Sequence, residues 1–159
     1  MVRRSAGLLL WRSGPDGTEV LLGHPGGPLF AGKDSWTIPK GEYEQGEPAL
    51  AAAHREFAEE VGVAPPEGEC VPLGEVTLRS GKRVLVWALE GDLDVSEIHS
   101  NSFEMQWPPR SGRVQQFPEL DRAQWFALVK ATAKIFPAQA PYLDRLADHL
   151  AGPLPDRDP

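Results

Sequence analysis

The sequence predicts an α/β fold in which a mixed β-sheet lies between layers of helices. Short apolar runs typical of strands occur before and after a central helical segment, and a second helical pattern lies near the end of the chain. The 159 residues are enough for one domain with a sizeable core. We therefore assign residues 1–151 to a single domain and expect residues 152–159, GPLPDRDP, to form a disordered tail.

The first half of the chain is expected to supply two strands, a loop and the central helix. Apolar runs at 5–11 and 19–22 predict neighbouring strands, and the Gly/Pro-rich residues 25–34 predict a loop. The helix is expected to begin at Pro48, because the missing N–H of proline costs nothing at the first helical position. Gly62 is expected to end it, because glycine accepts the left-handed conformation that terminates many helices.

The second half of the chain is expected to complete the sheet and the second helical layer. Residues 84–89 are apolar on both sides, so their strand should be central and covered on both faces. Residues 91–113 look mostly irregular, with a candidate short strand at 102–106. The elements expected after the central helix are strands at 73–78, 83–89 and 123–126, and helices at 127–135 and 139–150.

The composition limits the kinds of binding partner and the cellular compartment that we expect for this protein. A net charge of −7 argues against a protein that binds nucleic-acid backbones, which usually carries a basic patch. Cys70 is the only cysteine, which excludes an internal disulfide. The first apolar run is too short for a signal peptide, and no run approaches the ~20 residues of a membrane span. We expect a cytoplasmic protein without nucleic-acid or membrane partners.

The central helix carries two different faces. An apolar stripe is predicted from Leu50, Ala53, Phe57 and Val61, which recur at spacings of three and four. The carboxylates of Glu56, Glu59 and Glu60 share another face, where like charges repel one another. A hard cation such as Mg²⁺ reverses the sign of that interaction, since it prefers oxygen ligands. Taken alone, E-x-x-E-E is more typical of a solvated acidic helix face than of a metal site.

The surrounding residues decide between these readings. Residues 41–63, GEYEQGEPALAAAHREFAEEVGV, resemble the Nudix box, G-x5-E-x7-R-E-U-x-E-E-x-G-U, where U is a bulky apolar residue. A chance match to its fixed residues is expected on the order of once in 10⁸ to 10⁹ positions. The resemblance extends from about residue 5 to residue 128. It implies an α/β/α sandwich and an enzyme that cleaves a pyrophosphate bond in a nucleoside diphosphate linked to another group. The matching residues are Gly41, Glu47, Arg55, Glu56, Phe57, Glu59, Glu60, Gly62 and Val63.

The resemblance also implies roles for individual residues. Glu56, Glu59 and Glu60 are the expected ligands of Mg²⁺, with Mn²⁺ as an alternative, and Glu59 or Glu60 would orient or deprotonate the attacking water. A further metal ligand is expected from a loop before a late Trp. Glu119 fits best and Asp121 is the runner-up, while a solvated loop carboxylate is the alternative. The residues expected to support the backbone and the loop are Gly41, Glu47, Arg55 and Gly62.

Substrate contacts are expected mainly from the residues that precede the motif. Lys40 stands between Pro39 and Gly41, which is similar to Nudix members that act on longer polyphosphates, and a lysine here can pair with a phosphate. Trp36 is a candidate platform for a base, together with Phe30, Phe103 and Trp107, although each is at least as easily explained by packing. Arg110 and Arg113 are candidates for contacts with distal phosphates. The substrate-binding candidates are thus Lys40, Gly41, Trp36 and Arg110.

The function expected from these residues is metal-dependent hydrolysis of nucleoside or dinucleoside polyphosphates. A Nudix-fold module that senses a nucleotide without cleaving it is the alternative, which the complete set of motif glutamates disfavours. A homodimer is compatible with the family, but nothing in the sequence marks an interface. The sequence leaves open the base, the number of phosphates, the bond cleaved and the identity of the general base.

Overall fold

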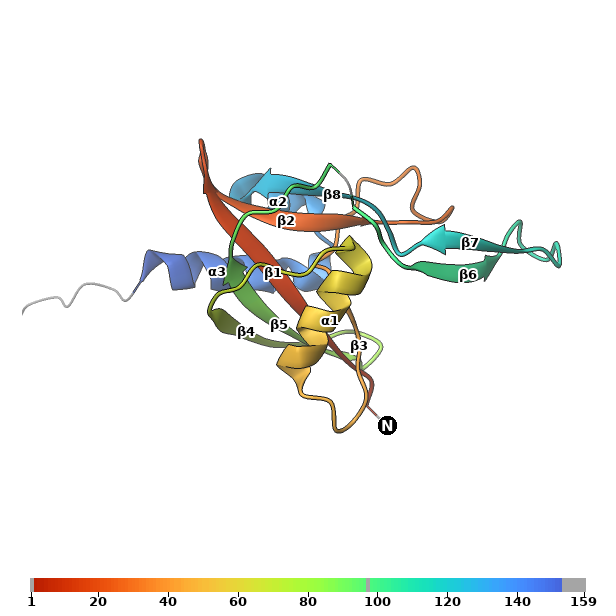
Figure 1. Cartoon of the computed structure of the whole chain (residues 1–159), viewed down its shortest axis with the longest axis horizontal. Coiled ribbons are helices and arrows are strands. Elements are labelled where there is room, and N and C mark those ends of the chain that lie inside the picture. The colour runs from red at the N-terminus through yellow and green to blue at the C-terminus, as the bar shows by residue number, and fades with distance from the viewer. Residues whose placement is uncertain (1, 97, 153–159) are drawn as a thin grey trace, which may run out of the picture.

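The computed structural model describes residues 2–96 and 98–152, so residues 153–159 of the expected tail lie outside the described residues. A six-stranded sheet separates α1 (Ala49–Val61) from α2 (Leu128–Lys134) and α3 (Ala140–Ala151) (Figure 1). A 3₁₀ turn at Pro137–Gln139 joins the last two helices. The predicted α/β/α sandwich is confirmed. None of the helices among the described residues is long and apolar enough to cross a membrane.

The sheet is mixed, as predicted, and is built around its first strand. The strands are ordered β4-β5-β1-β2-β8, and the short β3 also pairs with β1. Only the β1–β5 pairing is parallel in this sheet as the described residues define it. The strands are β1 (Arg4–Gly14), β2 (Gly17–Pro25), β3 (Lys40–Glu42), β4 (Cys70–Thr77), β5 (Arg83–Glu90) and β8 (Leu120–Ala127).

The core is two-layered because the side chains of β1 alternate between the two faces of the sheet. Leu8 and Leu10 pack with Phe57 of α1, whereas Leu9 packs with Tyr142 and Leu146 of α3. The burial predicted for β5 is only partly correct. Its side chains at positions 84, 86 and 88 are fully buried on the α3 side, but those at 85 and 87 are half-buried on the α1 side.

Helix α1 starts and stops almost where the sequence predicts. Pro48 is extended and forms the N-cap rather than the first helical residue, and Gly62 ends the helix with φ 89°. The apolar stripe needs one correction, because Leu50 is 36% exposed while Ala52 is fully buried. Leu50 lies in the first turn, next to the exposed loop that leads into the helix, whereas Ala52 packs against the sheet.

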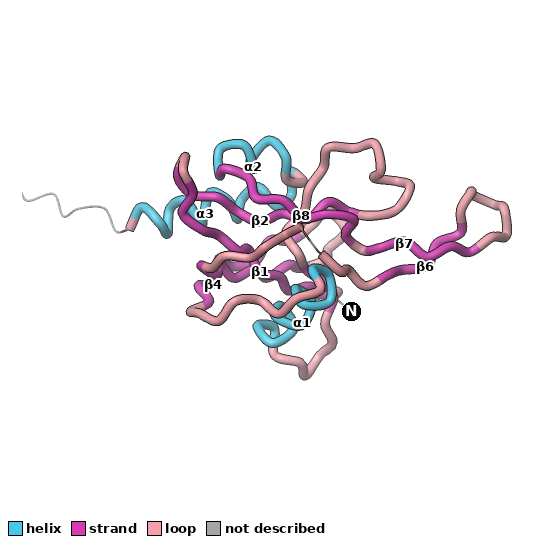
Figure 2. Tube along the Cα trace, turned by 45° about the horizontal axis from the view of Figure 1, so that its top comes forward, coloured by secondary structure: helices cyan, strands magenta, loops and turns pink. Residues whose placement is uncertain are grey.

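A two-stranded hairpin projects from the body of the molecule (Figures 1 and 2). It consists of β6 (Ser102–Gln106), the predicted candidate strand, and β7 (Val114–Pro118), which was not predicted. Two adjacent glutamines and a proline interrupt the sequence of β7, VQQFP, so it lacks the apolar alternation by which strands are found in sequence.

His24 is fully buried and ties three segments together. Its Nδ1 lies 2.9 Å from Asp121 Oδ1 in β8, and its Nε2 lies 2.7 Å from the carbonyl oxygen of Lys33. Through these two contacts His24 holds the 26–34 loop against β8.

Replacing His24 with alanine is expected to lower the free energy of unfolding by about 2–4 kcal/mol, because Asp121 and the Lys33 carbonyl lose their buried partner. Urea denaturation of His24→Ala and of the exposed control His149→Ala would measure the difference. Equal stability of the two variants would show that this network contributes nothing to the fold.

Candidate active site

The packing of α1 against the backbone of β3 fixes the positions of the first two acidic side chains of the site, Glu56 and Glu60. A Cβ placed on Gly41 would lie 1.9 Å from Glu56 Oε2, so only glycine lets that carboxylate approach the strand. A hydrogen bond fixes the carboxylate of Glu60, because the backbone N–H of Lys40 donates to Glu60 Oε2 at 3.0 Å. Adjacent β3 residues thus receive side chains from successive turns of the helix.

These carboxylates are held in a poorly solvated, mutually repulsive cluster. The pKa of Glu60 is raised to about 8, mainly by burial and also by the negative charges of Glu56 and Glu119, although the hydrogen bond from the Lys40 N–H opposes this shift. Burial also raises the pKa of Glu56 and of Glu119. Such a shift shows that the metal-free site stabilises the ionised carboxylates less well than water does.

Arg55 bridges the loop and the helix on the outer side of the cluster. Its Nη2 donates to Glu47 Oε1 at 2.9 Å, its Nη1 donates to Glu56 Oε1 at 2.8 Å, and the same Nη1 lies 3.3 Å from Glu59. These contacts raise the pKa of Arg55 above its ordinary value, with the Glu47 hydrogen bond as the largest cause. The positions of Glu47 and Arg55 suit the supporting role expected for them.

The structure separates the two candidates for the additional acid. Glu119 lines the same pocket as Glu60 and is placed by a backbone relay, in which its N–H donates to Asn101 O and the Asn101 N–H donates to Glu59 O. Asp121 instead binds His24. We therefore retain Glu119 and replace the Asp121 alternative with a role in the His24 network.

A pocket of about 470 Å³ opens beside these carboxylates. Lys40, Glu60 and Glu119 form its charged side, while Phe30 and Phe136, whose rings meet edge to face, form part of its apolar side. A charged end next to an apolar aromatic end suits a ligand with phosphates and a base. Sequence reasoning missed Phe136 and the pocket residue Gln139, because both lie far from the motif in the chain and reach the site only through the fold.

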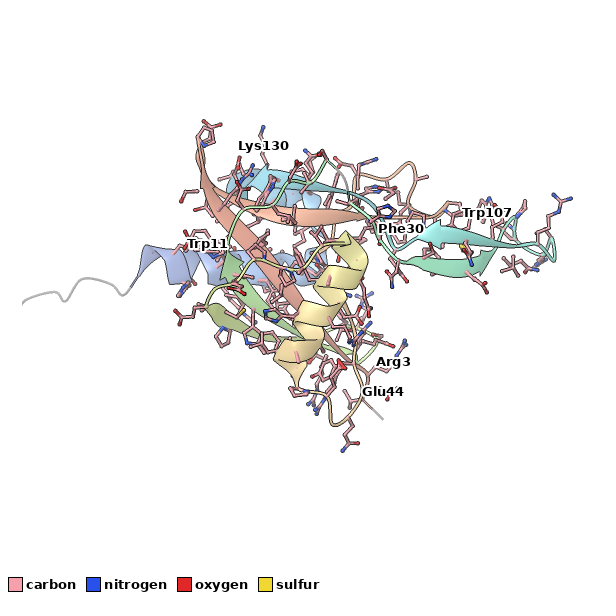
Figure 3. All side chains as sticks on the ribbon, viewed as in Figure 1. Arg3, Trp11, Phe30, Glu44, Trp107 and Lys130 are labelled. Atoms are coloured by element: carbon pink, nitrogen blue, oxygen red, sulfur yellow. The ribbon has the colours of Figure 1, made fainter. Side chains whose placement is uncertain are left out.

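Three of the four substrate-binding candidates, Gly41, Trp36 and Arg110, do not line this pocket. The prediction for Trp36 needs correction, because its indole is 3% exposed and packs edge-on against His24 and Phe126 in the core. Arg110 lies in the turn between β6 and β7, five residue pairs beyond the base of the hairpin, or roughly 16 Å along the strands. Figure 3 shows Trp107, at the start of the same turn, well away from α1.

The donor chemistry of the cluster fits a hard divalent cation. Glu56, Glu59, Glu60 and Glu119 offer carboxylate oxygens, the ligands that Mg²⁺ prefers, and the repulsion among them would be relieved by bound positive charge. Within residues 2–96 and 98–152 no three His, Cys, Asp or Glu side chains form a ready-made metal cage. Arg55 takes up oxygens of Glu56 and Glu59 in this arrangement.

Comparison with known proteins places this arrangement in a family. The model of the NUDIX domain matches residues 1–146. The chain belongs to the Nudix family.

A sequence relative and two solved structures show the range of similar Nudix proteins. The 8-oxo-(d)GTP phosphatase of Mycolicibacterium smegmatis is 39% identical over 123 residues, covering 71% of this chain but only 37% of the relative. The Ap4A hydrolase of C. elegans, as a binary complex, has a TM-score of 0.66 at 23% identity and covers 93% of this chain and 98% of that one. The NUDIX domain of Shewanella oneidensis NrtR complexed with ADP ribose has a TM-score of 0.65 at 14% identity and covers 94% and 89%. At these identities the two structures support the fold.

Gly41→Ala is expected to abolish most activity and to cost about 1–3 kcal/mol of stability, because the new methyl group occupies the position of the Glu56 carboxylate. Gly32→Ala is the matched control, since a Cβ there meets nothing within 4 Å. Hydrolysis assays and urea denaturation would measure both effects. A fully active Gly41→Ala enzyme would contradict the close approach of Glu56 to β3.

Glu60→Gln is expected to stabilise the metal-free protein at alkaline pH. The folded-state pKa of about 8 lies above the unfolded value, so the ionisation of Glu60 reduces stability progressively as the pH rises from about 4.5 to about 8. The glutamine cannot ionise, so the variant should gain on the order of a few kcal/mol at pH 9 and almost nothing at pH 4. Thermal unfolding in EDTA across this range tests the sign. A gain that is independent of pH would exclude the ionisation as its cause.

Proposed function

We propose that the chain is a divalent-metal-dependent pyrophosphohydrolase that cleaves a phosphoanhydride bond in nucleoside or dinucleoside polyphosphates. The observation that carries the proposal is the half-buried acidic cluster of Glu56, Glu60 and Glu119 beside a pocket that also presents Lys40 and an aromatic wall. A bound cation would favour the ionised form of these carboxylates, whose pKa values burial raises. A solvated acidic helix face would show neither the burial nor the pocket.

The residues divide the chemistry between them. Glu56, Glu59, Glu60 and Glu119 would hold Mg²⁺, or Mn²⁺, which when bound neutralises phosphate charge and lowers the pKa of a coordinated water. Glu60 has one oxygen engaged by the Lys40 N–H, which leaves the other able to orient or accept a proton from the attacking water. Glu59, the most exposed of the motif glutamates, is the alternative base.

The substrate assignment rests on two further features. The relative named as an 8-oxo-(d)GTP phosphatase supports a nucleoside triphosphate as substrate, although the chain spans little more than a third of that relative. Lys40 adds a positive charge at the pocket, which supports a longer phosphate chain. We also propose that the enzyme is cytoplasmic, acts without nucleic acid or membrane partners, and is able to form a homodimer.

The proposal predicts metal-dependent turnover that depends on the motif glutamates. Canonical and 8-oxo (d)NTPs, diadenosine polyphosphates and ADP-ribose would be assayed with Mg²⁺ and with EDTA, with the products identified. Glu60→Gln should lower kcat by at least about 10³-fold while retaining the fold, because both a metal ligand and a base candidate are changed.

Glu44→Gln in the exposed loop before α1 is the matched control and should retain activity (Figure 3). Tight nucleotide binding without turnover of any compound would replace the enzyme with a nucleotide sensor. Full activity in EDTA or in Glu60→Gln would remove the metal or this residue from the reaction.

A further inference from the structure

Strand β8 carries a β-bulge close to its start. Two consecutive residues of β2, at positions 24 and 25, pair with Arg122 and Leu120, which leaves Asp121 as an extra residue in β8. An extra residue in one strand of an antiparallel pair bends that strand and changes the direction of its side chains. The bulge lies directly after Glu119, the acid that joins the motif glutamates at the pocket.

The bulge reverses the alternation of side chains along β8. Trp125 and Ala123, two residues apart, both pack on the α1 side of the sheet. Strict alternation would continue that face to Asp121, but the buried residue of the α1-side core is Leu120. Asp121 instead contacts His24. The residues before the bulge are thereby turned to the opposite face of the strand from the one that regular pairing would give them.

The position of Glu119 follows from this reversal. Glu119 lines the pocket together with Glu60, and its negative charge contributes to the raised pKa of both Glu56 and Glu60. Regular pairing would exchange the sides of Glu119 and Leu120, because a shift by one residue moves every side chain to the other face. The carboxylate would then point toward the apolar core beside α1.

The segment 99–101 holds the bulge from the outer side. The N–H of Glu119 donates to the carbonyl oxygen of Asn101 at 2.8 Å, and the N–H of Leu120 donates to Ser100 Oγ at 3.0 Å. Successive N–H groups of a regular strand point to opposite edges, whereas these two point to the same segment. Ser100 therefore supplies an acceptor that regular pairing would not require.

The same segment is fixed to the end of α1. The N–H of His99 donates to the carbonyl oxygen of Val61 at 3.0 Å, and the N–H of Asn101 donates to that of Glu59 at 2.9 Å. A Cβ on Gly62 would lie 2.4 Å from the carbonyl oxygen of His99, so this crossing is close enough to require glycine. The segment thus connects the helix that carries the motif glutamates to the strand that begins beside Glu119.

We propose that Ser100 is a positioning residue for the divalent cation. Its hydroxyl holds the N–H of Leu120 and keeps the bulge in the conformation that directs Glu119 to the motif glutamates. Leu120 is buried, so its N–H loses its partner when the hydroxyl is removed, and the bulge loses a reason to keep this shape. The inference rests on the proposed function, in which Glu119 is a metal ligand, and adds a residue outside the motif on which metal binding depends.

The first measurement is the binding of Mn²⁺ alone, followed by the electron paramagnetic resonance signal of the free ion. Ser100→Ala should weaken Mn²⁺ binding about tenfold, as the loss of groups that orient metal ligands does. Ser100→Thr keeps the hydroxyl and should bind Mn²⁺ like the wild-type protein. Ser102→Ala, at an exposed position two residues along the chain, is the matched control and should also bind normally.

The second measurement is a double-mutant cycle with the carboxylate itself. Glu119→Gln should weaken Mn²⁺ binding, and adding Ser100→Ala to it should change the affinity by less than about twofold, because both changes act on the same ligand. A general loss of stability would instead weaken binding in both backgrounds. Ser100→Cys, which retains a side chain but is only a weak acceptor, should reproduce the loss if Ser100→Ala does not fold.

The inference is overturned if the wild-type protein does not bind Mn²⁺, if Ser100→Ala or Ser100→Cys binds it as tightly as the wild type, or if the effects of Ser100→Ala and Glu119→Gln are additive. It is also overturned if Ser102→Ala shows the same loss. If the wild-type protein turns over no compound while Mn²⁺ binding depends on Ser100 through Glu119, the proposed hydrolase activity fails and the positioning role stands. If turnover is found but Mn²⁺ binding is indifferent to Ser100, only the positioning role fails.

Discussion

The site depends on the close approach of helix α1 to the short strand β3. The hydrogen bond from the Lys40 N–H to Glu60 and the tight contact of Glu56 with Gly41 fix the helix relative to the strand at two successive residues. Phe57 and Val61, on the neighbouring side of the helix, bury the apolar area that holds this arrangement together. Packing energy from the core thus offsets the electrostatic cost of bringing the carboxylates together.

The charges around this contact are arranged in layers. Arg55 compensates Glu47, Glu56 and Glu59 on the outer side, where water is available, whereas Glu60 faces the pocket with only a backbone donor. Glu60, the most buried of these acids, therefore lacks the contact with Arg55 that compensates the outer carboxylates. The charge of Glu60, on the pocket side, can therefore be compensated by a bound ligand. The charges on the outer side are already compensated by Arg55.

Most of the helix and its chemistry could be predicted because the information is local. Proline, glycine and the spacing of apolar and acidic residues fix the ends and faces of α1 within one short segment. The failures involve tertiary context. Nothing in the sequence around Trp36 tells whether the indole faces the core or a ligand, and Leu50 continues the stripe although the first turn of α1 remains half-exposed.

The elements that were missed are stabilised by pairing rather than by their own composition. Strand β3 has only three residues and exists because β1 offers it an edge, and β7 is ordered by β6. Because the β6–β7 hairpin is stabilised by its own pairing, its sequence and length are less constrained than those of the main sheet. Within the part of the chain that the structure describes, its strands pair only with each other, so its length can change without shifting the register of the main sheet. It is a module through which related chains can acquire new surfaces while the chemistry beside α1 stays unaltered.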